Sequence, residues 1–188
     1  QLTTEIFGFF SPARPDFAVE MAELPIQTTA RFNAEWISKF YVSMYSMAAN
    51  ADPNNSVKEN LISFAEKSRK ELPKNSYASK MYDFVKKQYY EGLPWETIRD
   101  NVYKRYQVDQ KDGYDLTSRN LKCNACAAAG INFAASLISL FYGRGDLKRT
   151  IQIGTLVGWD SDNPTATWGG LLGFILGKKK IMKIFNNY

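Results

Sequence analysis

Residues 140–177 read LFYGRGDLKRTIQIGTLVGWDSDNPTATWGGLLGFILG, and this stretch decides the fold class. Residues 143–146 combine a glycine that ends one helix with an aspartate that caps the next, so a helix should follow to about residue 157. Residues 158–164 form a polar loop, and Pro164 suits the first turn of a final helix. The stretch therefore predicts two helices joined by a short loop.

Outward from this stretch, the chain also favours helices. Residues 29–51 carry aromatic and methionine side chains at steps of three and four, which is typical of an amphipathic core helix. Pro15 opens a short helix that should end at Pro25. Either Asn55 or Ser56, and either Asn75 or Ser76, suits the cap position of a later helix. The sequence predicts an all-α, multi-helix bundle.

Two further features predict how helices pack. Residues 125–142 are almost uncharged, but the run is short and contains polar residues such as Asn132, so a buried central helix explains it better than a membrane span. The final helix carries Gly169, Gly173 and Gly177, four residues apart on one face. Because glycine costs a helix interior ~1 kcal/mol, this spacing predicts very close approach of a neighbouring helix.

Composition limits the chemistry. The 188 residues include no histidine, which excludes imidazole as a catalytic base and as a ligand of zinc, haem or copper. The length fits a single α-helical unit over 1–188. The formal net charge is +5, but acidic and basic residues alternate through 57–111, and the lysines of 178–183 suit a solvated helix end. We therefore expect neither nucleic acid nor a membrane as a partner.

The two cysteines, Cys123 and Cys126, leave two interpretations open. They make half of a four-cysteine zinc site, and the βαβ context of a thioredoxin motif is missing. Two small residues facing a helix are favoured, and a disulfide, within the pair or to another chain, is the alternative. Residues 54–56 form a glycosylation sequon. Together with the start at Gln1 and the basic charge, the sequon favours a processed, secreted protein over a cytoplasmic one.

The candidate site is the loop sequence Asp160-Ser161-Asp162-Asn163. Two carboxylates two residues apart, before a helix whose natural cap is Asn163, can point at one centre. Carboxylate, hydroxyl and amide oxygens are hard ligands that suit Mg²⁺, Mn²⁺ or Ca²⁺. The alternative is that both aspartates merely cap the helix. An EF-hand is excluded, because its glycine and its distal glutamate are absent.

Residues 132–177 resemble the C-terminal signature of the ADP-ribosylglycohydrolase family. The likeness lies in a small-residue helix, a Tyr-Gly turn, Gly-Asp, a second helix, Gly-x-Asp-x-Asp at 158–162 and a glycine-rich helix. Residues 4–24, TEIFGFFSPARPDFAVEMAEL, resemble the family's middle segment. The resemblance is specific around 158–177 and loose between about 57 and 120.

The resemblance implies an all-α, roughly orthogonal bundle, incomplete in this chain, with two magnesium ions (manganese in some members). In the family these ions bind ADP-ribose and help to cleave an ADP-ribosyl bond. Asp160 and Asp162 match the aspartates of the Asp-x-Asp-Thr metal motif, and Asn163 stands at the threonine position, where its carbonyl oxygen still suits a metal.

The family's other metal ligands come from an N-terminal Thr-Asp-Asp motif, and this chain contains no Asp-Asp pair. The resemblance therefore implies half of a binuclear site, weak or inactive alone. The chain is then expected to be a C-terminal subunit paired with an N-terminal chain of the same precursor, or a fragment. Ile6, Phe9 and Phe10 predict an apolar junction with such a partner. A relative without activity, kept as a structural or storage protein, is the alternative.

Three further residues are candidates for binding substrate. Trp159 and Ser161 flank Asp160, although a structural role is favoured for Trp159. Tyr114 lies in the polar segment 108–120 and is a candidate to stack on an adenine. No catalytic residue is assigned, because the general base would have to be a carboxylate supplied upstream. The predicted function is a metal-dependent hydrolase of ADP-ribosyl bonds when complemented by its N-terminal part.

Overall fold

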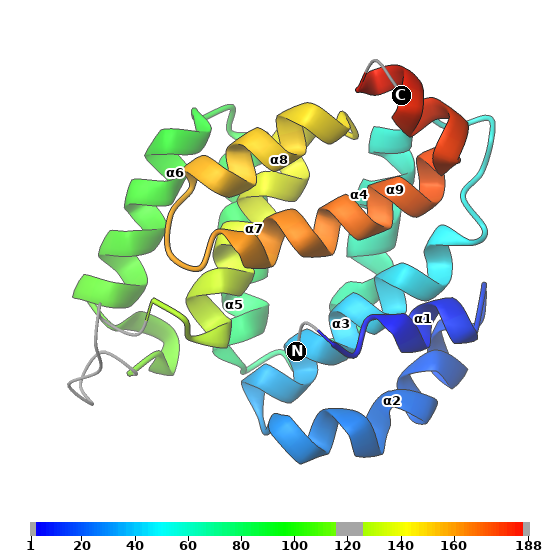
Figure 1. Cartoon of the computed structure of the whole chain (residues 1–188). Helices are drawn as coiled ribbons and strands as arrows, with labels where there is room; N and C mark the ends of the chain where they lie inside the picture. The colour runs from blue at the N-terminus through cyan, green and yellow to red at the C-terminus, as the bar shows by residue number, and fades with distance from the viewer. Residues whose placement is uncertain (1–2, 116–125, 186–188) are drawn as a thin grey trace.

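The computed structural model describes residues 3–115 and 126–185, and these ranges contain nine α-helices and no β-strand (Figure 1). The all-α prediction is confirmed. In chain order the helices are α1 (Ile6–Phe10), α2 (Pro15–Thr29), α3 (Asn33–Ala48), α4 (Val57–Ser68), α5 (Tyr77–Tyr90), α6 (Trp95–Val102), α7 (Ala129–Gly143), α8 (Leu147–Leu156) and α9 (Asp162–Ile184). A π-helix, Tyr103–Val108, continues α6.

Helix α7 lies in the middle of the molecule, in contact with α3, α5, α6, α8 and α9 (Figure 1). Every residue of 130–143 is buried. This confirms the buried central helix that the uncharged run predicts, although α7 begins at Ala129 rather than near residue 125. Within residues 3–115 and 126–185, no helix combines the length and apolarity needed to cross a bilayer.

Helices α1 and α2 pack against α3 at the lower edge of the view in Figure 1. Helix α2 runs through Pro25 to Thr29, so the prediction that it ends at Pro25 is wrong. A proline inside a helix costs ~3 kcal/mol. Ala18, Ala22 and Ile26 form a buried face against Val42 of α3, and this packing continues the helix past the proline.

Local capping chemistry behaves as the sequence predicts. Ser56 accepts a hydrogen bond from the backbone N–H of Glu59, whose side chain returns to the Ser56 backbone in a capping box. Ser76 caps α5, and Asp146 caps α8 by accepting from Arg149. The helix boundaries at these three places follow from side chains only a few residues apart.

The glycines of α9 do not provide the close packing that their spacing predicts. A Cβ placed on Gly169 would meet no described atom within 4 Å, and at Gly173 the nearest is Ile181 Cδ1 at 3.5 Å. Gly177 breaks the helix with φ +74°. A close approach of two helices occurs instead at Gly8 of α1, whose Cβ would lie 2.5 Å from Tyr45 Cβ and 2.6 Å from the backbone oxygen of Val42.

We predict that Gly8→Ala lowers the free energy of unfolding by about 2–3 kcal/mol, because the added methyl would collide with the backbone of α3. Gly169→Ala is the matched control. It adds the same methyl to an uncrowded helical position and should be neutral or stabilising by up to ~1 kcal/mol. Urea unfolding followed by circular dichroism measures both. Equal effects of the two substitutions would contradict the packing described for Gly8.

One carboxyl group is buried where α1 meets α9. Glu5 is 6% exposed and accepts a hydrogen bond from Thr167 Oγ1 at 3.0 Å. Burial raises the pKa of the Glu5 carboxyl above its usual range, although hydrogen bonds from its own backbone and from Thr167 oppose the shift. The folded protein therefore favours the protonated form more than the unfolded chain does.

This raised pKa predicts a pH-dependent difference between the natural protein and Glu5→Gln. As pH rises through the pKa of Glu5 in the folded state, ionisation costs the natural protein stability, whereas a glutamine has no proton to lose. From pH 7 down to pH 4, the natural protein should gain stability relative to the variant, as measured by urea unfolding. The exposed Glu20→Gln is the control, and parallel curves for Glu5→Gln would contradict the burial effect.

Candidate functional site

The loop that joins α8 to α9 carries the predicted site. Gly158 and Trp159 both have positive φ, +96° and +56°, so the chain reverses sharply before Asp160. Such a φ is rare for a bulky residue such as tryptophan and indicates that contacts hold the loop in place. The first of these contacts is the indole N–H of Trp159, which donates to Gln107 Oε1 of the π-helix at 2.5 Å.

Asn132 of α7 makes the second contact. It is completely buried, and its Oδ1 accepts the backbone N–H of Asp160 at 3.1 Å. Its Nδ2 donates to the carbonyl oxygens of Cys126 at 2.7 Å and Ala128 at 3.0 Å. One amide therefore joins the start of α7 to the loop. This role is not among the predictions from the sequence. An asparagine inside an uncharged helix does indicate it, because a buried amide needs hydrogen-bond partners.

The carboxyl groups of Asp160 and Asp162 are close enough to share a hydrogen bond. This bond is the main cause that raises the pKa of the Asp160 carboxyl, followed by burial and by the charge of Asp162. Two carboxylates held this closely repel each other unless a proton or a cation lies between them. The two carboxyl groups are thus neighbours, and their role as metal ligands stays a prediction.

Asn163 was expected to cap α9, and this is wrong. The helix begins at Asp162, and Ser161 occupies the cap position. Asn163 is 4% exposed, and its Oδ1 has no hydrogen-bond partner among the described residues. A buried carbonyl oxygen left unpaired costs ~1–3 kcal/mol, so this atom is suited to receive a ligand.

Asp160 and Asn163 line the same pocket, which has a volume of about 260 Å³. Its other lining residues are Thr29, Ala30, Ala34, Ala127 and Ala129. The walls come from the end of α2, the start of α3 and the start of α7, and their small side chains leave the space open. The pocket therefore combines a wall of alanines with three oxygen-bearing side chains, those of Thr29, Asp160 and Asn163.

Oxygen donors of this kind fit a hard divalent cation. In the part of the chain that the structure describes, no group of three or more acidic, cysteine or histidine side chains gathers around one point. Mg²⁺ takes about six oxygen ligands. Two carboxylates and one amide oxygen would leave the remaining positions to water or to groups from elsewhere.

The three candidate substrate residues have different surroundings. Trp159 is half-buried and binds Gln107, so it supports the loop. Ser161 is the cap residue of α9, and its carbonyl oxygen accepts from Thr165 Oγ1 at 3.0 Å. Tyr114 is completely buried, edge-on to Tyr77 and Tyr106 with ring centroids 5.1 and 6.0 Å away. The prediction that Tyr114 stacks on an adenine is wrong, because neither face of its ring is open.

Cys126 forms a disulfide, which corrects the interpretation of the cysteines as small residues facing a helix. Cys126 precedes Ala128, the cap residue of α7, so it lies outside that helix. Cys123 lies outside the described residues. Cys126 also supplies one of the carbonyl oxygens that Asn132 binds, so the disulfide-bonded residue is part of the support of the site.

The fold and this loop define an all-α protein with an Asp-x-Asp site at the start of a long helix. The ADP-ribosylglycohydrolase family model matches residues 2–183, and the chain belongs to that family. Neither a comparison with curated proteins nor one with solved structures returned a match. Family membership over nearly the whole chain supports a hydrolase of the ADP-ribosylglycohydrolase type.

We predict that Asn132→Ala lowers the free energy of unfolding by about 2–4 kcal/mol, because it removes the acceptor of the Asp160 N–H and the side-chain donor to the carbonyl oxygens of Cys126 and Ala128. The amide of Asp160 should also exchange its hydrogen faster. Asn132→Asp is the matched control, since it keeps the acceptor for that amide but loses the donor to Cys126 and Ala128. Hydrogen exchange followed by NMR should show Asp160 protected in the control and exposed in Asn132→Ala. Equal protection in both variants would contradict the role of Asn132.

Proposed function

We propose that this protein hydrolyses ADP-ribosyl glycosidic bonds with the help of Mg²⁺ or Mn²⁺ bound at the loop between α8 and α9. The observation that carries the proposal is the buried, unpartnered Oδ1 of Asn163 in the pocket that Asp160 also lines. Asp160 and Asp162 would hold the metal through their carboxylates, with Asn163 as the third oxygen ligand. Family membership supplies the substrate class, ADP-ribose or an ADP-ribosylated molecule.

Different residues of the chain would have different roles in such a site. A bound metal ion would polarise the glycosidic bond or a water molecule. Asn132 fixes Asp160 through its backbone, and Trp159 holds the loop against the π-helix. A loop held in this way would need little reorganisation to turn both carboxylates toward one cation. Ser161 and Trp159 are the remaining candidates for contacts with substrate.

We further propose that the rest of a binuclear site comes from an N-terminal segment or chain of the same precursor. The chain contains no Asp-Asp pair, so a Thr-Asp-Asp motif would have to be supplied from outside it. Ile6 and Phe10, which are 49% and 62% exposed, offer apolar surface for such a contact. Phe9, beside them, packs against Tyr45 and Phe174 instead.

We predict that Mn²⁺ broadens the NMR signals of residues 160–163 at substoichiometric concentration, because a paramagnetic ion relaxes nearby nuclei even when it binds weakly. Asp160→Asn should remove most of this broadening, since it leaves one carboxylate. Glu20→Gln, which removes an exposed charge on α2, is the control and should leave the broadening unchanged. Signals of 160–163 that respond no more than those around Glu20 would refute the metal site.

Calorimetry with ADP-ribose on the protein together with its N-terminal segment then tests the activity class. Binding that needs Mg²⁺, and that Asp160→Asn weakens by about tenfold or more, supports the hydrolase. Mn²⁺ binding without any heat from ADP-ribose would favour the structural or storage protein instead.

A further inference from the structure

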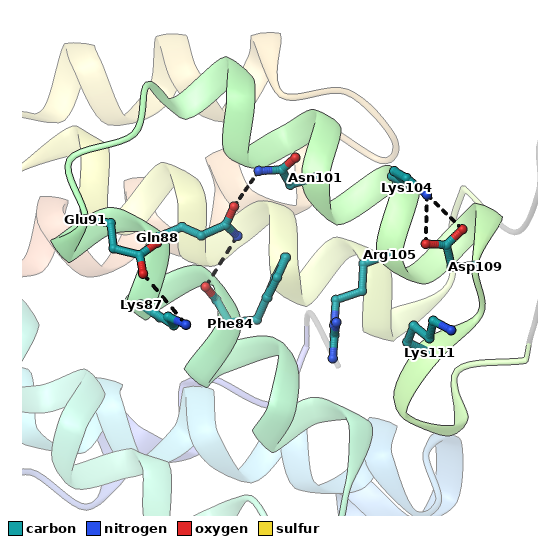
Figure 2. Close-up of a pocket in the computed structure, with 9 residues that line it drawn as sticks. All are labelled: Phe84, Lys87, Gln88, Glu91, Asn101, Lys104, Arg105, Asp109 and Lys111. Atoms are coloured by element: carbon teal, nitrogen blue, oxygen red, sulfur yellow. Dashed lines mark hydrogen bonds and ion pairs between the residues drawn. The ribbon is translucent and has the colours of Figure 1, made fainter.

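A second pocket, about 410 Å³ in volume, lies between α5 and the arm formed by α6 and the π-helix (Figure 2). It shares no lining residue with the pocket of Asp160 and Asn163. Its volume lies within the ~300–1,000 Å³ that small-molecule sites occupy. Nothing in the proposed hydrolase uses it.

The π-helix determines which side chains enter this pocket. The backbone N–H of Asp109 donates to the carbonyl oxygen of Lys104 at 2.8 Å, five residues earlier, where an α-helix would bond four residues back. Lys104 and Arg105 lie in this wider turn, and both line the pocket. Turns of this type are rare and occur often at functional sites.

The floor of the pocket is a flat, cationic surface. The Arg105 guanidinium lies over the ring of Phe84, 4.9 Å from the ring centroid. Asp112 Oδ2 fixes the guanidinium by accepting from its Nε at 3.1 Å and by an ion pair with its terminal nitrogen at 2.9 Å. A planar group can therefore lie along an Arg–Phe pair whose position is already set.

An amide pair forms the wall behind this floor. Asn101 Nδ2 donates to Gln88 Oε1 at 2.6 Å, and Gln88 Nε2 donates to the carbonyl oxygen of Phe84 at 3.4 Å. Gln88 is only 6% exposed. These bonds join α5 to α6 and hold polar atoms at the edge of the pocket, as Figure 2 shows.

The charge of the lining is positive, with four cationic side chains against two carboxylates. Lys87 pairs with Glu91 at 3.7 Å on one side of the pocket, and Lys104 pairs with Asp109 at 2.9 Å on the other (Figure 2). Lys111 also lines the pocket and forms no ion pair with any described residue. Three ammonium groups, two of them ion-paired, thus surround the guanidinium of Arg105.

We propose that this pocket binds a small phosphate monoester that carries a flat organic group. A phosphate monoester has a charge of about −1.5 to −2 at pH 7, opposite in sign to the net positive charge that remains around the pocket when Asp112 is counted with the lining. Lysines act as point charges around phosphate, and Lys111 is available for this role. The flat group lies on the Arg105–Phe84 pair. A long polyanion fits less well, because Glu91 and Asp109 lie at the rim.

Phenyl phosphate is the probe, because it joins the two required groups in a small molecule. Calorimetry is done with the full chain in EDTA, so that the metal site takes no part. We expect saturable binding about tenfold tighter than that of inorganic phosphate or phenol. Binding that is not saturable at millimolar probe, or no preference over inorganic phosphate, overturns the proposal.

Variants then locate the binding. Lys111→Gln should weaken phenyl phosphate about fivefold, whereas Lys179→Gln, the same change on the exposed end of α9, should have no effect. Phe84→Leu should keep the affinity for inorganic phosphate and lose the preference for phenyl phosphate. Asp160→Asn should bind the probe as the natural protein does, which separates this pocket from the proposed hydrolase site. Equal affinity in Lys111→Gln and Lys179→Gln overturns the proposal.

Discussion

The burial of α7 is the constraint on which the rest of the structure depends. A helix without a charged residue over 130–143 is stable in water only if other helices cover it on every side. Helices α3, α5, α6, α8 and α9 supply that cover. Because α8 and α9 both lie against α7, the loop between them is held at the end of the same helix. The position of the candidate site is therefore a consequence of how the core is covered.

Asn132 shows how this apolar helix still supports a polar site. It lies in the first turn of α7, where its side chain reaches backbone groups that lie outside the helix. Its amide satisfies carbonyl oxygens before the helix and the N–H of Asp160 across from it. Serines deeper in α7 behave similarly: Ser136 bonds Tyr41, and Ser139 donates to the carbonyl of Thr150. Each polar side chain in α7 connects it to a neighbour.

The sequence predicts correctly where short-range chemistry decides the outcome. Caps such as Ser56 and Asp146 act on groups three residues away, and the convergence of Asp160 and Asp162 needs only a loop followed by a helix. The errors concern long-range packing. Pro25 stays inside a helix because α3 lies beneath it, and Tyr114 is buried by rings from α5 and the π-helix. Spacing along the sequence could not show that Gly8, rather than the glycines of α9, lies at a close helix contact. That difference depends on which helix packs against each glycine.

The π-helix connects the two pockets and gives a reason why the chain keeps an irregular turn. Lys104 and Arg105 line the second pocket, between α5 and α6, which we call the basic pocket. Gln107 accepts the hydrogen bond of Trp159 in the candidate site. An α-helix through the same residues would rotate every later side chain by about 100°. Such a rotation would separate Gln107 from Trp159, or Arg105 from Phe84. The wider turn of the π-helix allows both contacts, that of Gln107 with Trp159 and that of Arg105 with Phe84. The loop of Asp160 and the floor of the basic pocket therefore depend on the same local distortion.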